Sequence, residues 1–443
     1  MTRWGTTWML LGFMLVNFAD KTVLGLSATH VMADLGLSRE EFGTVSSAFF
    51  ALFSLAALAG SALTRRVRTP VLLLGMALLW SVAQLPMLLS VAGFGTLLVT
   101  RVLLGAAEGP AAPVALHHLH GWFAHRERTL PTSVLLFGAA AGVAVAAPTL
   151  GLVIDHWGWR AAFGTVGVVG LLWAAVWHRY GGEGPYAPPV GRAASRGRAG
   201  AGAGETVPYR RILLSGTWLA AAFGAFAAYW TLSAGLTWSA DYFQQAAGLS
   251  LRSASLLLMC GALAKGLTMV GHGLLVQRSV RRAAAGGPAS RSPLSEGANN
   301  GLLLGVAAVA TAAFALTDVL WFKVVLLLGP MALVDIVLTV ASTAVSRIAP
   351  AAQRGVCLGA LTGVFALAGV VAPLTMGAVV DAHASVTDGY RDAYLLKACL
   401  VAAAAVAVTF FLRPERDAAR LGVSASAPAD GEAVSRPAPA PRR

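Results

Sequence analysis

The chain has 443 residues, of which 57% are hydrophobic and only 12% are charged. Because about a quarter of the residues of a soluble protein are charged, this composition excludes a soluble enzyme and is typical of a polytopic membrane protein. The net charge of +13 would suggest nucleic-acid binding in a soluble chain, but the arginines lie in short segments between apolar runs, where membrane orientation explains them. No nucleic-acid function is therefore expected.

Twelve apolar runs are long enough to cross a lipid bilayer as helices. The first run follows Arg3, as in a secretory signal, but it continues through Asp20 and Lys21 without a convincing cleavage site, so we expect it to remain as a first span. The runs lie at roughly 7–30, 40–63, 70–90, 96–118, 129–153, 161–178, 212–238, 253–276, 300–317, 320–345, 354–380 and 392–412.

Basic residues alternate along the connections between these runs. The termini and the connections after even-numbered runs hold most of the arginines, in clusters such as residues 65–68 and 278–282. The connections after odd-numbered runs hold few basic residues, namely Arg39, Arg160, Arg252 and Arg391. Since positively charged loops stay in the cytoplasm, we expect an integral protein of the cytoplasmic (inner) membrane with both termini in the cytoplasm.

Composition divides the chain into two halves of six spans each. Residues 179–211 are rich in Gly, Ala, Pro and Arg, which is typical of a solvated linker, and residues 416–443 have too few large apolar side chains to form a core. We therefore predict an N-terminal six-helix half over 1–178, a cytoplasmic linker over 179–211, a C-terminal six-helix half over 212–415 and a disordered cytoplasmic tail over 416–443.

Local repeats indicate that the two halves are related. The frame Gly-x-x-x-x-Arg-x-x-Arg follows the second run from Gly60 and the eighth run from Gly273, and Pro148 in the fifth run matches Pro373 in the eleventh. A parallel repeat of six-helix halves is a transporter architecture with substrate held near mid-membrane. The predicted fold is an all-α membrane protein with 12 transmembrane helices in two six-helix, pseudo-repeated halves.

The fourth run contains an arginine and a glutamate, Arg101 and Glu108. An ionised side chain at the centre of a spanning helix costs roughly 2.5 to 3.5 kcal/mol, so such residues usually face a protein interior or a wet cavity. Their seven-residue separation places both on one face of a helix, and Pro110 and Pro113 predict a kink beside Glu108. Two interpretations remain open: a structural ion pair to a neighbouring helix, or a transport site whose glutamate takes up and releases a proton.

Other charges lie deep in the predicted spans. Asp20 and Lys21 in the first run point about 100° apart on a helix, so they form either a neutralising pair or a site in which one of them meets the substrate. Lys265 in the eighth run and Asp335 in the tenth either pair across helices or line the cavity.

Several motifs resemble those of known transporters. The segment from Gly60 to Arg68 is similar to the loop motif Gly-x-Leu-Ala-Asp-Arg-x-Gly-Arg of the major facilitator superfamily, although Thr64 and Val67 replace its acid and its second glycine. Residues 17–21 (Asn-Phe-Ala-Asp-Lys) and 101–113, with Trp122-Phe123, Glu127-Arg128 and Gly158-Trp159-Arg160-Ala161-Ala162-Phe163, resemble the anion:cation symporter family within that superfamily.

The resemblance implies alternating access and proton-driven import of a small organic anion. By resemblance, Asp20 and Glu108 are the protonation sites, Arg101 is the basic partner of Glu108, and Lys21 stands where the family usually has an arginine that holds the substrate carboxylate. Lysine is a point charge without the planar fork of arginine, which predicts looser carboxylate recognition. The predicted substrate-binding residues are Lys21, Arg101, Tyr229, Trp230, Ser233, Thr237 and Thr362.

The proposed partners are a small-molecule organic anion, protons and the lipid bilayer, with no cofactor and a monomeric state. Two other functions stay open: proton-coupled export of an amphipathic compound and, more remotely, a membrane-embedded enzyme.

No function can be assigned to the histidines from the sequence. Metal binding would need more ligands near the histidine cluster of the fourth run than the chain offers there. These histidines are His30, His117, His118, His120 and His272. Trp238, at the end of the seventh run, is interpreted as an interfacial anchor.

Overall fold

The computed structural model describes residues 2–64, 66–124, 127–187, 207–284, 296–350 and 353–423. These residues form helices and no strands. Within these described ranges, ten helices are long and apolar enough to cross a membrane by length and composition. One of them, α7 (Thr129–Tyr180), contains the fifth and sixth predicted spans, and α3 (Arg39–Leu63) corresponds to the second. The predicted all-α membrane fold is confirmed, and each predicted span corresponds to a helical segment.

The described residues of the first half include the helices α1 to α7 and the short 3₁₀ turn η1. The two spans of α7 meet at Gly158, whose φ of +81° lies in the left-handed region that favours glycine, so the chain turns back there. The elements are α1 (Arg3–Leu26), α2 (Ala28–Leu35), α3, α4 (Thr69–Gln84), η1 (Leu85–Leu88), α5 (Phe94–Glu108), α6 (Ala111–His120) and α7.

The second half repeats this helical arrangement with two irregular turns. A π-helical turn, η3 (Tyr242–Ala246), ends the seventh span, and a 3₁₀ turn, η4 (Pro330–Asp335), interrupts the tenth. The helices are α9 (Tyr209–Leu213), α10 (Gly216–Asp241), α11 (Leu251–Ala284), α12 (Glu296–Leu316), α13 (Leu320–Leu328), α14 (Ile336–Ile348), α15 (Arg354–Asp381), α16 (Val386–Phe411) and α17 (Pro414–Arg420).

Two spans are broken near their middle. The break between α5 and α6 falls at Gly109 and Pro110, which confirms the predicted kink. The span predicted at 320–345 corresponds to the candidate span Leu320–Ile348, and it is broken where α13 ends before Gly329 and Pro330 begins η4. Proline has no backbone N–H to continue the helix, so the backbone changes direction there.

The ends of the predicted linker and the start of the predicted tail are helical. In the linker range 179–211, α7 extends to Tyr180 and α9 begins at Tyr209, while residues 188–206 lie outside the described residues. The predicted disorder from residue 416 was wrong for the first residues, since α17 spans Pro414–Arg420. Residues 424–443 also lie outside the described residues, so the domain limits stay a prediction.

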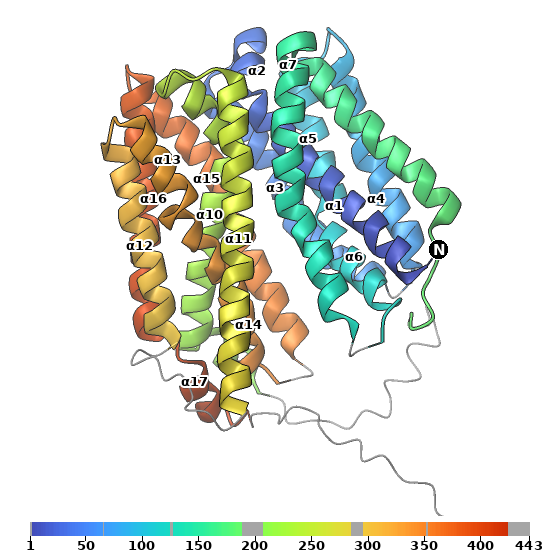
Figure 1. The fold of residues 1–443 in the computed structure, drawn as a ribbon, viewed down its shortest axis with the longest axis vertical. Coiled ribbons are helices and arrows are strands. Elements are labelled where there is room, and N and C mark those ends of the chain that lie inside the picture. The colour runs from blue at the N-terminus through green and yellow to red at the C-terminus, as the bar shows by residue number, and fades with distance from the viewer. Residues whose placement is uncertain are drawn as a thin grey trace, which may run out of the picture.

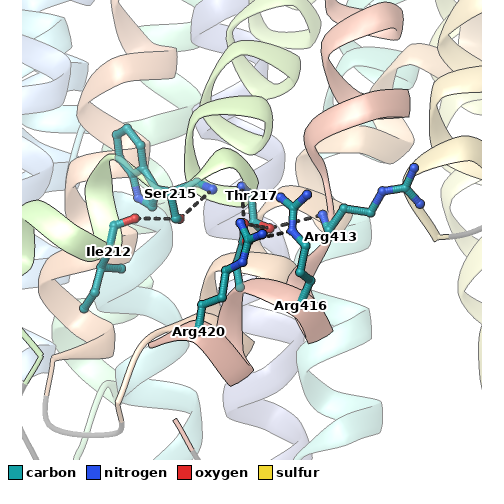
Figure 2. A network of polar contacts seen from close by, with 8 residues as sticks. Ile212, Ser215, Thr217, Arg413, Arg416 and Arg420 are labelled. Carbon is teal, nitrogen blue, oxygen red and sulfur yellow. Dashed lines mark hydrogen bonds and ion pairs between the residues drawn. The ribbon is translucent and has the colours of Figure 1, made fainter. Parts of the chain in front are cut away.

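Polar contacts hold α17 against the start of α10 (Figure 2). The Asp417 carboxylate accepts hydrogen bonds from the Thr217 backbone N–H at 2.9 Å and the Thr217 hydroxyl at 2.7 Å, and the Arg413 N–H donates to that same hydroxyl oxygen. Burial alone would raise the pKa of Asp417, but hydrogen bonds from Arg416 and Thr217 outweigh it and lower this pKa below its ordinary value. The ionised carboxylate therefore anchors the first turn of the predicted tail.

The two halves lie side by side and meet closely at the end of the molecule that carries α2, opposite α17 (Figure 1). There a Cβ at Gly25 would lie 1.8 Å from the Leu236 carbonyl oxygen, so only glycine permits this approach of α1 to α10. Within the described residues, the hydrogen bonds between the two halves join residues 29–47 to residues 237–241, 370 and 381. We call this region the closed end.

Close packing also fixes α5 against α3 within the first half. A Cβ at Gly105 would lie 1.8 Å from the Phe49 carbonyl oxygen, whereas a Cβ at Gly75 in α4 would meet no atom within 4 Å. We expect Gly105→Ala to lower the melting temperature of the detergent-solubilised protein, because overpacking costs about 1 to 3 kcal/mol. The matched control Gly75→Ala should leave it unchanged or raise it slightly, since alanine favours a helix interior. Equal melting temperatures of the two variants would contradict this packing.

Candidate functional site

Lys21 and Glu108 form a buried ion pair between α1 and α5. The Lys21 Nζ lies 2.7 Å from Glu108 Oε2, and the exposed fractions of the two side chains are 9% and 0%. The same ammonium donates a hydrogen bond to the Asn17 amide oxygen at 2.5 Å and lies 4.5 Å from the centre of the Phe18 ring. Lys21 therefore neutralises Glu108, not its sequence neighbour Asp20.

Asp20 and Arg101 are joined through a glutamine that the sequence analysis missed. Gln84, the last residue of α4, donates its amide N–H to Asp20 Oδ1 at 2.5 Å and accepts a hydrogen bond from Arg101 Nη2 at 2.5 Å. Asp20 and Gln84 are fully buried and Arg101 is 2% exposed. Asp20 Oδ2 and Arg101 Nε have no hydrogen-bond partner among the described residues. The glutamine thus links acid and base while leaving atoms of both open to a ligand or a proton.

Together these residues form a charge-balanced cluster, which we call the first-half cluster: Asp20, Lys21, Arg101 and Glu108, with the neutral side chains Asn17 and Gln84. Burying an ion takes several kcal/mol of hydration free energy even in a real protein, and only a nearby counter-charge offsets that loss. With its two carboxylates and its two cations ionised, the cluster has a net charge of zero. Any anion that enters must therefore displace an acid, or bring a positive charge with it.

Glycines and prolines allow these charges to meet. A Cβ at Gly109 would lie 2.1 Å from the Phe53 carbonyl oxygen, so glycine at 109, as at 105, lets α5 lie directly against α3. Pro86 ends the helical run of α4 just after Gln84, where the chain changes into η1. The local sequence thus fixes both the approach of the helices and the position of the bridging glutamine.

A small cavity of about 20 Å³ lies between the halves beside the cluster, which is room for about one water molecule. Residues of both halves line it: Lys21, Leu24, Ser46, Phe49, Phe50, Arg101, Leu236 and Thr237. The Thr237 hydroxyl lies 2.7 Å from that of Ser46, on α3. Of the residues predicted to bind substrate, Lys21, Arg101 and Thr237 therefore share one space.

The other predicted substrate residues of the second half lie farther along α10 and α15. The Tyr229 ring packs edge-on against Phe50 of the first half, with centroids 5.9 Å apart. The Ser233 hydroxyl donates to the Gly369 carbonyl oxygen at 3.3 Å. Trp230 is buried with its indole N–H unpartnered among the described residues, and Thr362 donates to the Leu358 carbonyl oxygen of its own helix. The structure brings Tyr229 to the seam between the halves but leaves Ser233 and Thr362 bonded to backbone.

Trp238 is not an interfacial anchor. It is fully buried, and its indole N–H donates to the Pro373 carbonyl oxygen at 3.0 Å. The interpretation of Trp238 as an anchor was wrong because it used only the position of the residue near the end of a span. That position does not distinguish a ring that faces lipid from a ring that faces the other half. His118 is likewise structural: it is 3% exposed and lies 2.8 Å from the Thr69 hydroxyl.

Asp241 closes the molecule at the closed end. This fully buried carboxylate accepts hydrogen bonds from Thr29 and Arg39 of the first half, at 2.8 and 3.0 Å, and from the Tyr390 hydroxyl at 2.5 Å. The sequence analysis missed it because Asp241 falls just outside the run predicted to span. Its donors come from α2 and α3 of the first half and from α16 of the second, so separation of the halves at this end requires the bonds from Thr29 and Arg39 to break.

Lys265 and Asp335 pair across helices, which was one of the two alternatives for them. The Lys265 Nζ lies 3.2 Å from Asp335 Oδ2. A third charge, Lys397 on α16, is 5% exposed and was missed by the sequence analysis, although a lysine inside an apolar run was a visible signal.

Pairing of Lys21 with Glu108 predicts a coupled effect on stability. Lys21→Gln leaves a buried carboxylate without its cation, which should lower the unfolding free energy by about 3 to 5 kcal/mol. Adding Glu108→Gln removes the stranded charge and should recover most of the loss, as measured by melting temperatures in detergent.

The matched control is the exposed pair of Arg3 and Glu127, whose side chains are 52% and 51% exposed. A double-mutant cycle with glutamine at these two positions should show a coupling free energy of less than about 1 kcal/mol. Additive losses for Lys21→Gln and Glu108→Gln would show that the buried pair does not stabilise the fold.

Comparison with known proteins supports the same architecture. The family model of the Major Facilitator Superfamily matches residues 9–292. The chain is 28% identical over 247 residues to a hexuronate transporter of Bacillus subtilis (strain 168), covering 55% of this chain and 57% of that protein. It is 25% identical over 315 residues to a D-galactonate transporter of Escherichia coli O6:H1, covering 66% and 71%.

The first of these matches thus spans little more than half the length of the relative. Among solved structures, a bacterial homolog of the human lysosomal transporter Spinster, in an inward-facing and unoccupied conformation, has a TM-score of 0.74 at 20% identity. That match covers 94% of this chain and 98% of that one, and it shows a shared fold.

Proposed function

The chain belongs to the Major Facilitator Superfamily, and we propose that it is a secondary transporter that takes up a small organic anion of the sugar-acid class together with a proton. The observation that carries the proposal is the neutral first-half cluster, in which Lys21 is held by Glu108 at 2.7 Å beside a cavity between the halves. The names of the relatives, a hexuronate and a D-galactonate transporter, support the substrate class.

Competition for Lys21 couples the anion to the proton. A substrate carboxylate that binds Lys21 displaces Glu108, which then lies buried without its cation. Since an unpaired buried carboxylate is strongly unfavourable, Glu108 takes up a proton, and the cluster stays neutral with the substrate bound. One proton therefore accompanies each carboxylate that binds at Lys21. This coupling is a shared charge balance between two ligands, so each ligand raises the affinity for the other.

Arg101 and Asp20 supply the second contact. Arg101 Nε is without a partner among the described residues, and its guanidinium also carries further N–H donors that can bond a second oxygen of the anion. Gln84 stands between Arg101 and Asp20, so Arg101 is not locked in a direct two-point ion pair with the acid. Thr237 adds a hydroxyl from the second half, which suits the polyol part of a sugar acid.

Alternating access then follows from the contacts at the closed end. The arginine distribution supports both termini in the cytoplasm of an inner-membrane protein, so the closed end, opposite α17, faces outward. Outward opening requires the Asp241 bonds to Thr29 and Arg39 to break while the halves pivot about the cluster. The substrate then enters from outside and leaves toward the cytoplasm.

Glu108→Gln tests the coupling role directly. The amide keeps the shape and hydrogen-bonding capacity of a protonated glutamate but cannot release a proton. We expect proteoliposomes with this variant to lose accumulation driven by a pH gradient while exchange of labelled for unlabelled substrate continues. Glu127→Gln is the control, because Glu127 pairs with Arg3 at an exposed position outside both the cluster and the closed end. Accumulation that persisted in Glu108→Gln would assign coupling to another residue.

Substitution of Lys21 separates anion uptake from export of an amphipathic compound. Lys21→Gln removes a charge-assisted contact worth roughly 1.5 to 3 kcal/mol, so the affinity for a sugar-acid anion should fall by about 10- to 150-fold in a binding titration. Lys21→Arg should keep or strengthen binding, because a guanidinium can bond both carboxylate oxygens. Unchanged anion affinity in Lys21→Gln would favour the exporter.

A further inference from the structure

Three arginines gather on and beside α17, at the end of the molecule opposite the closed end: Arg413, Arg416 and Arg420, which we call the arginine patch. Arg416 and Arg420 are about one helical turn apart, so they project from the same side of α17. Figure 2 shows both side chains extending from α17 toward the first turn of α10, and they are 42% and 70% exposed. A guanidinium stays ionised at physiological pH, so the patch is a permanent group of positive charges.

One carboxylate lies among these arginines, and its oxygens already have partners. Asp417 is 3% exposed, and its Oδ2 accepts the two hydrogen bonds from Thr217. Its Oδ1 accepts a hydrogen bond from Arg416 Nε at 2.9 Å, and Arg420 Nη1 lies 4.0 Å from the same oxygen. Positive charge therefore exceeds negative charge in the patch.

The arginine patch also keeps unused hydrogen-bond donors. Each guanidinium carries five N–H donors in a planar fork that matches phosphate oxygens. In the part of the chain that the structure describes, Arg420 makes no hydrogen bond and the Arg416 side chain makes one, to Asp417. The other acid of α17, Glu415, lies 3.2 Å from Arg347 and so meets a different cation. The patch can thus receive an anion without the loss of an existing ion pair.

The arginine patch lies where the helices of the second half leave the hydrocarbon core of the membrane. Phe410 and Phe411, at the end of the candidate span on α16, are 62% and 56% exposed. Leu214, just before α10, is 59% exposed. In a chain that spans a membrane, exposed apolar side chains of this kind face the lipid tails. Arg413 follows two residues after Phe411, so the arginines stand at the level of the lipid headgroups.

We propose that the arginine patch binds the phosphate of an anionic phospholipid in the leaflet that meets α17. The phosphate oxygens accept hydrogen bonds from Arg416 and Arg420, and the acyl chains lie along the exposed apolar ends of α10 and α16. Basic clusters beside the ends of spanning helices recognise anionic headgroups by this combination of charge and position. A zwitterionic lipid brings its own cation, so it offsets the excess charge less. This lipid site lies apart from the transport site and does not depend on the proposed substrate.

Lipid binding reinforces a contact between α17 and α10 that the fold already contains. A Cβ at Gly216 would lie 3.3 Å from Arg416 Nη2, so this guanidinium lies directly on the first turn of α10. A headgroup bonded to Arg416 and Arg420 adds a further link at this place. Because a ligand that binds only the folded state stabilises it, anionic lipid should raise the melting temperature of the protein.

The test compares phosphatidylglycerol, which is anionic, with phosphatidylcholine, which is zwitterionic, in versions with the same acyl chains. Each lipid is titrated onto the delipidated, detergent-solubilised protein, and native mass spectrometry counts the bound lipids. We expect phosphatidylglycerol to bind about 10-fold or more tightly, and this advantage to fall as the salt concentration rises. Equal affinities for the two lipids would overturn the proposal. Inorganic phosphate at the same concentration should not displace phosphatidylglycerol, and displacement would assign the patch to a free anion instead.

Substitutions in the patch assign the preference to its arginines. Arg416→Gln combined with Arg420→Gln should raise the dissociation constant of phosphatidylglycerol by about 30-fold, as expected for the loss of two arginines near an anionic lipid surface. Binding of phosphatidylcholine should stay unchanged. The bonds between Asp417 and Thr217 remain in this variant, so α17 stays docked.

The matched control is Arg68→Gln. Arg68 also lies at the end opposite the closed end and is 64% exposed, but its guanidinium already pairs with Glu183 at 3.0 Å. This variant should bind phosphatidylglycerol as the wild type does. Unchanged lipid affinity in the double variant, or an equal loss in Arg68→Gln, would contradict the proposal. The comparison of the two lipids on the wild-type protein decides it even where the double variant fails to fold.

Discussion

The structure depends on the burial of four charges that must sum to zero. Asp20, Lys21, Arg101 and Glu108 lie where ions lose several kcal/mol of hydration each. They remain there because Glu108 pairs directly with Lys21 and Gln84 bridges Asp20 to Arg101. Close packing of α5 on α3 at Gly105 holds Arg101 and Glu108 in place, and Gln84 at the end of α4 bridges Arg101 and Asp20. The same constraint couples anion binding to protonation of the cluster, since a new anion can enter only with a compensating proton.

Much of this arrangement could be predicted from the sequence, and the reasons for the failures are physical. Apolar runs and arginine positions predicted the helical membrane fold, and Pro110 predicted the break between α5 and α6. The partners could not be predicted: Lys21 and Asp20 are neighbours in sequence, yet one meets Glu108 and the other meets Gln84. A neutral residue such as Gln84 gives no charge signal, and which face of α4 it occupies depends on tertiary packing.

The two halves use the same architecture for different electrostatic purposes. The first-half cluster is balanced, so its acids can exchange a cation for a proton, while the second half holds the ion pair of Lys265 and Asp335 at 3.2 Å. Between them, the closed end is held by Asp241 with donors from both halves. Charge exchange at mid-membrane and the breaking of polar contacts at one end are thus separate events, linked by the rigid helices that carry both.

Proton uptake on anion binding tests the central claim most directly. When D-galactonate is titrated into the purified protein in two buffers of different ionisation enthalpy, the difference between the binding heats gives the number of protons taken up. Charge balance in the first-half cluster predicts about one proton per bound anion near neutral pH, and none in Glu108→Gln. Binding of the anion to the wild-type protein without proton uptake would contradict the account.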